Sequence, residues 1–273
     1  MASRTSQVSR RMVAFAAGFA LLGAAGCGWG PDPAELGEVP SAEQLYQEGR
    51  AILAEGYTLF WVWDRTDYQE AIDRFQDIID NYPYSDYAVL ANLEIADTYF
   101  ARERYEEALS YYRDFAELHP QHARVAYALQ RAALCHYHQA RDPGRDQSAT
   151  RQAVVQFEDL MRRFPDSAEA AEAEVLWREL RTRLGTHVLG IGDFYLDRSE
   201  YQSAADRYRR VLNEYPGLGL DPEALYKLGV CYERMNLTDE ASKIFQVILD
   251  QYGDTEVAES AAELLPEQVP SAN

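Results

Sequence analysis

The sequence predicts an all-α protein, an α-solenoid built from five copies of one helical repeat. A pattern of 17 residues returns five times between residues 67 and 253. Within each copy, apolar residues keep the three-and-four spacing of an amphipathic helix. Each copy then ends at a proline or a glycine, and both stop a helix through their backbone chemistry. Repetition of one such unit is typical of solenoids.

Two positions of the 17-residue pattern have the same chemistry in every copy. The copies are residues 67–83, 104–120, 149–165, 200–216 and 237–253. The fifth position is Ala71, Ala108, Ala153, Ala204 and Ala241, and the ninth is Phe75, Tyr112, Phe157, Tyr208 and Phe245. Residues four apart lie on one helix face. We therefore expect the alanine to let a neighbouring helix approach closely beside the aromatic ring.

A second signature precedes these helices. The last copy follows Leu225-x-x-Leu228-Gly229-x-x-Tyr232, and the fourth follows Val188-x-x-Ile191-Gly192-x-x-Tyr195. Ala96 and Gly49 take the small position in the second and first copies. The combined pattern resembles the tetratricopeptide (TPR) repeat, in which pairs of antiparallel helices stack into a right-handed superhelix. The resemblance implies a right-handed solenoid of five TPR repeats over residues 41–253.

Four departures from a plain array are visible. About ten extra residues separate Gly49 from Ala71, and they include Tyr57, Phe60, Trp61 and Trp63. These aromatic residues either lengthen the first helix and are buried against a neighbour, or form an exposed aromatic tip. Residues 141–148 form a polar loop in the third repeat. Residues 167–197 contain no proline and predict one helix of about eight turns. Gly185, Gly190 and Gly192 should weaken its middle if they pack against no neighbour, because glycine is a poor helix former. Residues 254–273 predict a short capping helix and a tail.

The N-terminus predicts a lipoprotein signal peptide over residues 1–26. Three arginines precede an uncharged apolar run, which at about 22 Å is shorter than the roughly 30 Å of a membrane core, so a retained transmembrane helix is the weaker interpretation. The run ends in Leu22-Gly23-Ala24-Ala25-Gly26-Cys27, which resembles the lipobox of bacterial lipoproteins. We expect a covalent lipid on Cys27 and a flexible tether over residues 27–40. The alternative is an ordinary signal peptide followed by a free thiol.

The lipobox also bears on location. In the sorting system that it implies, an aspartate after the cysteine retains a lipoprotein at the inner membrane. Gly28 stands there instead, which points to the outer membrane, with the chain facing the periplasm. The formal net charge is -19, which argues against a nucleic acid partner, because phosphate backbones bind proteins mainly through lysine and arginine.

The sequence gives no indication of catalysis or of a bound cofactor or metal. His136 and His138 are two residues apart, so on a helix they point in different directions. No nucleophile elbow, HExxH motif or phosphate-binding loop occurs. A disulfide between Cys135 and Cys231 is conceivable, but both lie on apolar faces of non-adjacent repeats, so we favour two buried thiols.

The ordered combination of the Cys27 lipobox, five repeats, a looped third repeat and the long helix leading into Ile191-Gly192-Asp193-Phe194-Tyr195 resembles the BamD family. Members of that family are lipoprotein subunits of the β-barrel assembly (BAM) complex of the bacterial outer membrane. The resemblance implies binding to the POTRA domains of a barrel-forming BamA-type protein through the C-terminal repeats. It also implies that the N-terminal repeats receive unfolded outer-membrane protein precursors. The alternative is a periplasmic TPR lipoprotein that acts as a scaffold for envelope or division machinery.

A client groove is expected on the inner face of the first helix of each repeat. From the repeat register, seven residues are expected to line it: Tyr46, Arg50, Leu93, Asp97, Phe100, Gln130 and Tyr137. Aromatic rings and a cation would suit a peptide that ends in an aromatic residue with a free carboxylate. The competing interpretation is that these residues pack between repeats.

Overall fold

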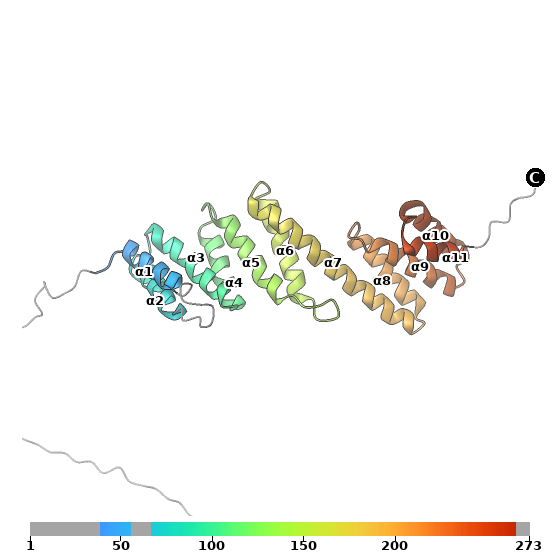
Figure 1. Ribbon diagram of the computed structural model, residues 1–273, viewed down its shortest axis with the longest axis horizontal. Helices are drawn as coiled ribbons and strands as arrows, with labels where there is room; N and C mark the ends of the chain where they lie inside the picture. The colour runs from blue at the N-terminus through green and yellow to red at the C-terminus, as the bar shows by residue number, and fades with distance from the viewer. Residues whose placement is uncertain (1–38, 56–66, 266–273) are drawn as a thin grey trace, which may run out of the picture. The chain divides into compact units, whose positions relative to one another are not determined.

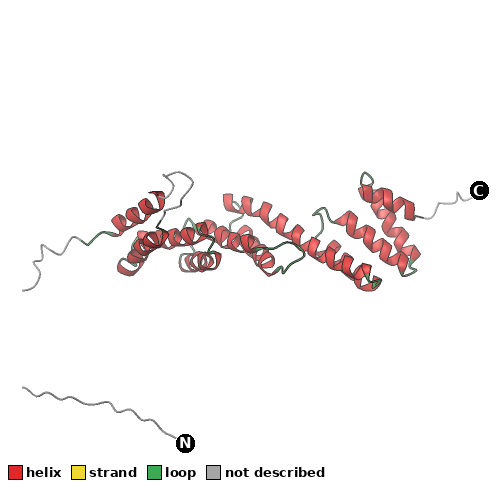
Figure 2. Ribbon diagram, turned by 60° about the horizontal axis from the view of Figure 1, so that its bottom comes forward, coloured by secondary structure: helices red, strands yellow, loops and turns green. Residues whose placement is uncertain are grey.

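The computed structural model describes residues 39–55 and 67–265, and every regular element in these ranges is an α-helix (Figures 1 and 2). The helices are α1 (Ala42–Glu55), α2 (Tyr68–Asn81), α3 (Asp86–Ala101), α4 (Tyr105–Leu118), α5 (Val125–Gln139), α6 (Ser148–Arg163), α7 (Ala168–Asp197), α8 (Tyr201–Glu214), α9 (Asp221–Arg234), α10 (Thr238–Tyr252) and α11 (Glu256–Leu264). Each packs against the next in chain order. The predicted all-α repeat fold is confirmed, with odd-numbered helices α1 to α9 as the first helix of each repeat (helix A) and α2 to α10 as the second (helix B).

The turns between repeats follow from a short recurring sequence. Helices α2, α6 and α10 end at an aromatic residue that is followed by proline or glycine and, two residues after that, by Ser85, Ser167 or Thr255. Each of these three hydroxyl oxygens accepts a hydrogen bond from the backbone N–H three residues ahead, at 3.1–3.3 Å. Such caps satisfy an amide group that the first helical turn leaves unpaired. The sequence thus ends one helix and begins the next within four residues.

Contact between a small residue and an aromatic ring holds the two helices of a repeat together. All five alanines at the fifth position, and all five rings at the ninth, are at most 1% exposed. Opposite the rings, a Cβ atom added to Gly49 would lie 2.7 Å from Phe75. The same addition to Gly192 or Gly229 would reach Tyr208 or Phe245 at 2.5 Å, closer than real Cβ atoms come. The predicted close approach of the helices is confirmed.

The long helix and the capping helix are confirmed as well. Helix α7 runs for 30 residues without interruption, and α11 packs against α9 and α10. Of the three glycines in α7, Gly185 packs against Leu220 and Tyr215, and Gly192 packs against Tyr208. Only Gly190 has open space where a side chain would project. The third repeat has its predicted loop, between Gln139 and Ser148.

Two glycines in α7 provide a test of this packing. Gly190→Ala should raise the free energy of unfolding by up to about 1 kcal/mol, because alanine is the better helix former and meets no neighbour. Gly192→Ala should lower it, because the buried Tyr208 ring cannot move away from the new methyl group. Urea denaturation followed by circular dichroism measures both variants. Stabilisation by both changes would contradict the close contact at Gly192.

Candidate functional site

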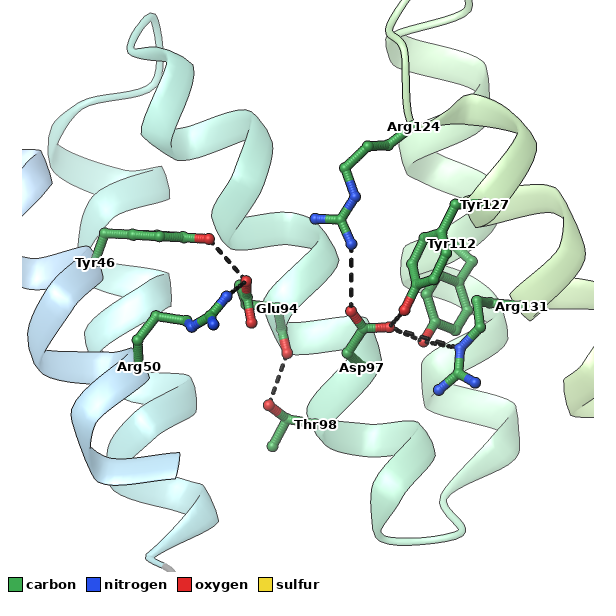
Figure 3. Close-up of polar contacts among 9 residues, drawn as sticks. All are labelled: Tyr46, Arg50, Glu94, Asp97, Thr98, Tyr112, Arg124, Tyr127 and Arg131. Carbon is green, nitrogen blue, oxygen red and sulfur yellow. Dashed lines mark hydrogen bonds and ion pairs between the residues drawn. The ribbon is translucent and has the colours of Figure 1, made fainter. Parts of the chain in front are cut away.

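Two neighbouring clusters of polar side chains, centred on Glu94 and Asp97 of α3, form a polar group with side chains of α1, α4 and α5 in the N-terminal repeats (Figure 3). It borders a pocket of about 410 Å³ that is lined by Arg50, Leu53, Ala54, Tyr68, Glu94, Asp97, Thr98, Ala101 and Arg124. The polar lining residues come mainly from the A helices. This face of the A helices is the surface on which the client groove was predicted.

Glu94 is the first centre of this group. Its carboxylate accepts hydrogen bonds from the Tyr46 hydroxyl at 2.7 Å and from the Arg50 guanidinium at 2.8 Å. Burial, followed by the bond to Glu94, raises the pKa of Tyr46, so the hydroxyl keeps its proton and remains a donor. The carboxylate oxygen is thus satisfied from α1, which links the first repeat to the second.

Asp97 is the second centre. It accepts hydrogen bonds from the hydroxyls of Tyr112 at 2.5 Å and Tyr127 at 2.6 Å. The Arg131 and Arg124 guanidinium groups lie 3.7 and 3.9 Å from its carboxylate. Burial and the Asp97 charge raise the pKa of both tyrosines, so both stay neutral donors. Four side chains from α4, α5 and the residue before α5 therefore converge on one carboxylate (Figure 3).

The surface of this group is cationic even though the chain is acidic. Three arginines face two carboxylates, which leaves one positive charge in excess. The side chain of Glu94 is only 10% exposed, whereas that of Arg50 is 56% exposed and that of Arg124 is 37% exposed. The Arg50 and Arg124 guanidinium groups are therefore more exposed to solvent than either carboxylate, since the Asp97 side chain is 26% exposed. Such an arrangement can bind an anionic group without burying an unpaired charge.

A related cluster occurs in the C-terminal repeats. The Tyr208 hydroxyl donates to Asp193 at 2.8 Å, and the Lys227 ammonium group donates to the two oxygens of Asp193 at 2.8 and 2.9 Å. Lys227 also contacts Glu223 at 2.6 Å. As with Asp97, Tyr112 and Arg131, an acid on one A helix takes a tyrosine from its own B helix and a cation from the next A helix.

The repeat register explains this similarity. Each A helix has one small residue, and these are Gly49, Ala96, Ala133, Gly192 and Gly229. The residue directly after the small residue of one A helix faces the next A helix. Its partner there lies two positions before the small residue of that next helix. The pairs are Arg50 with Glu94, Asp97 with Arg131, and Asp193 with Lys227. We call these pairs the inter-repeat ion pairs. At the junction of the third and fourth repeats, Leu134 and Gly190 occupy the two positions.

The choice of tyrosine or phenylalanine at the ninth position follows the same register. Tyr112 and Tyr208 belong to the repeats that carry Asp97 and Asp193 after the small residue. Phe75, Phe157 and Phe245 belong to repeats with Arg50, Leu134 and Val230 there. The ring lies over the small residue, so its hydroxyl reaches the next side chain along the helix. This match between aspartate and tyrosine is visible in the sequence, and it could have identified Arg131 and Lys227, which the sequence analysis missed together with Glu94 and Arg124.

The structure places the seven predicted groove residues in different surroundings. Tyr46, Arg50 and Asp97 lie together at the polar group described above. Phe100 lies beside it, with the Arg131 guanidinium 3.7 Å from its ring centre. Tyr137 is partly buried, and its hydroxyl donates to Glu179 of α7 at 3.0 Å.

Two of the seven are corrected. Leu93 is fully buried, because it lies three residues before Ala96 and faces the core around Tyr112 and Phe115. Gln130 is 7% exposed, and its amide donates to Glu172 of α7 at 2.8 Å. The additional N-terminal turns of α7 lie against α5 and cover this part of the face. Leu93 and Gln130 are therefore packing residues and do not line a surface groove.

Other sequence predictions concern chemistry and location. Cys135 and Cys231 are buried free thiols, as favoured, and burial raises their pKa values to about 12 and about 11. Within residues 39–55 and 67–265, histidine, cysteine and acidic side chains form no group of three that could hold a metal ion. No helix in the same ranges is both long and apolar enough to cross a membrane. Cys27, the signal peptide and the aromatic residues Tyr57 to Trp63 lie outside the described residues.

Comparison with known proteins gives a family. The family model YfiO, described as an outer membrane lipoprotein, matches residues 41–247. The chain belongs to the YfiO family. Among its YfiO-type relatives, the outer membrane protein assembly factor BamD of Caulobacter vibrioides is 28% identical over 235 residues, which are 86% of this chain and 74% of that protein. BamD of Rickettsia prowazekii is 30% identical over 204 residues, 75% of this chain and 77% of that protein.

Solved structures similar to this YfiO member include a thermophilic TPR protein from Thermus thermophilus. The similarity has a TM-score of 0.34 and 20% of residues identical, and it covers 82% of this chain and 98% of the other. The repeat assignment given above rests on the helices and the register of this chain.

Tyr112 provides a test of the Asp97 group. Tyr112→Phe keeps the buried ring but removes the hydrogen bond to Asp97, and it should lower the free energy of unfolding by about 1–2 kcal/mol. Tyr84→Phe is the matched control, because the Tyr84 side chain is fully exposed. Urea denaturation of the three proteins gives the comparison. Equal stability of the Tyr112 and Tyr84 variants would show that the Asp97 group does not stabilise the fold.

Proposed function

We propose that this chain is a lipid-anchored, non-enzymatic subunit of the machinery that folds β-barrel proteins into the bacterial outer membrane. Its membership of an outer membrane lipoprotein family and its similarity to BamD assembly factors over most of the chain support this role. In this proposal Cys27 carries the lipid, the repeats face the periplasm, and the work of the protein is binding alone.

The arginine-rich pocket of the N-terminal repeats is the observation that carries the proposal of client binding. An unfolded precursor that ends in an aromatic residue presents a carboxylate and a ring together. Arg50 and Arg124 line the pocket and are the most exposed charged groups of this site, so they can receive the carboxylate. Leu53, Ala54 and Tyr68 supply apolar lining for the ring. The charge-assisted hydrogen bonds of guanidinium groups favour such an end group over a neutral one.

A rigid set of donors suits this task. Arg50 is held by Glu94, and Arg124 is held over the Tyr127 ring at 4.7 Å from its centre. Side chains that are already ordered lose less conformational entropy when a peptide binds. The pocket therefore suits binding of the C-terminal end of a chain. We assign binding of the POTRA domains of a BamA-type protein to the C-terminal repeats, α9 to α11.

Mild detergent extraction of native membranes, followed by affinity capture, tests the assembly role. A POTRA-bearing barrel protein should co-purify in near-stoichiometric amount, and truncation after Pro216 should abolish its recovery. Cys27→Ala should release the chain from the membrane fraction. Recovery of envelope or division enzymes in place of the barrel protein would favour a general scaffold, and membrane retention of the Cys27 variant would contradict the lipid anchor.

Arg124 provides a test of the client pocket. Arg124→Gln should weaken binding of a peptide with a C-terminal phenylalanine carboxylate by about tenfold, since one charge-assisted contact contributes about 1.4 kcal/mol or more. The same peptide with a C-terminal amide should bind both proteins equally. Fluorescence anisotropy measures the affinities.

Arg113→Gln is the matched control for this experiment. Arg113 is 61% exposed on α4 and lines a different pocket. Its replacement removes the same charge from the chain without touching the proposed site. An equal loss of affinity in both variants would mean that the peptide responds to overall charge and does not bind at Arg124.

A further inference from the structure

The junction between the third and fourth repeats differs from its neighbours on the same face of the A helices. At the other three junctions, the residue two positions before the small residue is Glu94, Arg131 or Lys227, and it reaches back to form an inter-repeat ion pair. At the junction of the third and fourth repeats, Gly190 stands two positions before the small residue of α7. The position that would carry its partner on α5 is Leu134, which packs on the core of the third repeat. A Cβ atom added to Gly190 would meet nothing within 4 Å.

A pocket of about 510 Å³ lies at this junction. Its lining consists of Pro143 and Gly144 from the loop of the third repeat, together with Thr186, His187, Gly190, Ile191, Phe194 and Tyr195 from α7. The loop is tied to the helix, because the Pro143 carbonyl oxygen lies 2.5 Å from Nδ1 of His187. The two walls therefore come from separate elements that are joined by a direct contact.

The lining is mainly apolar and lacks any acidic or basic side chain apart from His187. Phe194 is 53% exposed, one of the few large apolar side chains in the described residues that solvent reaches so freely. The Arg198 guanidinium lies 3.8 Å from the centre of its ring. An exposed aromatic side chain beside an apolar hollow is typical of a binding surface.

This pocket belongs to the same face as the arginine-rich pocket. Counted from the small residue of its own helix, Gly190 occupies the position of Glu94, and Phe194 occupies the position of Thr98. Glu94 and Thr98 both line the N-terminal pocket, and Gly190 and Phe194 both line this one. An extended segment that follows the A-helix face would therefore meet a charged pocket in the N-terminal repeats and an apolar pocket beside α7.

We propose that the Gly190 pocket receives an aromatic side chain from the body of the same unfolded precursor whose C-terminus binds near Arg50 and Arg124. This inference rests on the proposed function and adds a second, apolar subsite to it. In an extended strand alternate side chains point to one side, so a segment with alternating aromatic residues offers rings at regular intervals to such a pocket. Glycine at position 190 supplies the room, and the lining contains no inter-repeat ion pair that the ring would have to desolvate.

Gly190→Met tests the subsite by filling it. The added side chain enters open space, and methionine is a better helix former than glycine, so the variant should fold at least as stably as the natural chain. The probes are two synthetic peptides with the same C-terminal phenylalanine carboxylate, one with alternating internal tyrosines and one with serines at those positions. Gly190→Met should weaken binding of the tyrosine peptide about tenfold and leave the serine peptide unchanged.

Val155→Met is the matched control, because Val155 is an exposed apolar residue on helix α6 and lines a different pocket. It should leave both affinities unchanged. The inference is overturned if the natural chain binds both peptides equally, or if Gly190→Met binds the tyrosine peptide as tightly as the natural chain does. It is also overturned if Gly190→Met leaves peptide binding intact and instead releases a co-purifying folded partner.

The two proposals can fail separately. If neither peptide binds the natural chain, client binding itself is wrong, and the subsite fails with it. If both peptides bind through their carboxylate but the internal tyrosines add nothing, the arginine-rich pocket stands and the Gly190 subsite does not. Thermal denaturation of each variant confirms that a change in affinity does not reflect loss of the fold.

Discussion

The contact between a small residue of helix A and the aromatic ring at the ninth position of helix B is the constraint on which the rest of the structure depends. At Gly49, Gly192 and Gly229 the ring lies so close that a methyl group would overlap it. This contact fixes how near the two helices come and how they are rotated about their axes. Once the rotation is set, the side chains on either side of the small residue have determined directions.

The polar groups follow from that rotation. A ring that covers the small residue points its far end at the next residue along the helix, and an aspartate there can bind a tyrosine hydroxyl. The aspartate also faces the following A helix, where Arg131 or Lys227 completes its partners. A single packing contact thus determines where charges gather on the A-helix face, and the client pocket that we propose uses side chains held in this way.

Much of the fold could be predicted from the sequence because helix signals are local. The five repeats, the uninterrupted α7, the loop before α6 and the capping helix all depend on residues near one another in the chain. The candidate site depends on contacts between helices, and there the prediction was partial. Arg50 and Asp97 were found because helical spacing shows which residues share a face. Glu94 was missed because an acidic residue on the polar face of a helix is usually exposed to solvent. Only the contacts with Tyr46 and Arg50 of α1 show that Glu94 is buried.

The two corrected residues have separate physical causes. Leu93 was placed on the groove from the repeat register. The register alone does not distinguish the exposed edge of a helix face from the edge that packs against the neighbouring helix. Gln130 does lie on the A-helix face. It is covered by turns of α7 that an ordinary repeat would lack, and no pattern around Gln130 itself signals this cover.

The length of α7 has a consequence for how the protein unfolds. Repeat arrays often melt in stages, because each unit contacts only its neighbours. In α7, Leu180 and Leu184 belong to the core of the third repeat, while Val188 and Leu189, about one turn further on, belong to the core of the fourth. Opening of the helix between Leu184 and Val188 would remove part of the wall of both cores. We therefore expect the third and fourth repeats to unfold as one cooperative unit, in contrast to an array whose repeats share no helix.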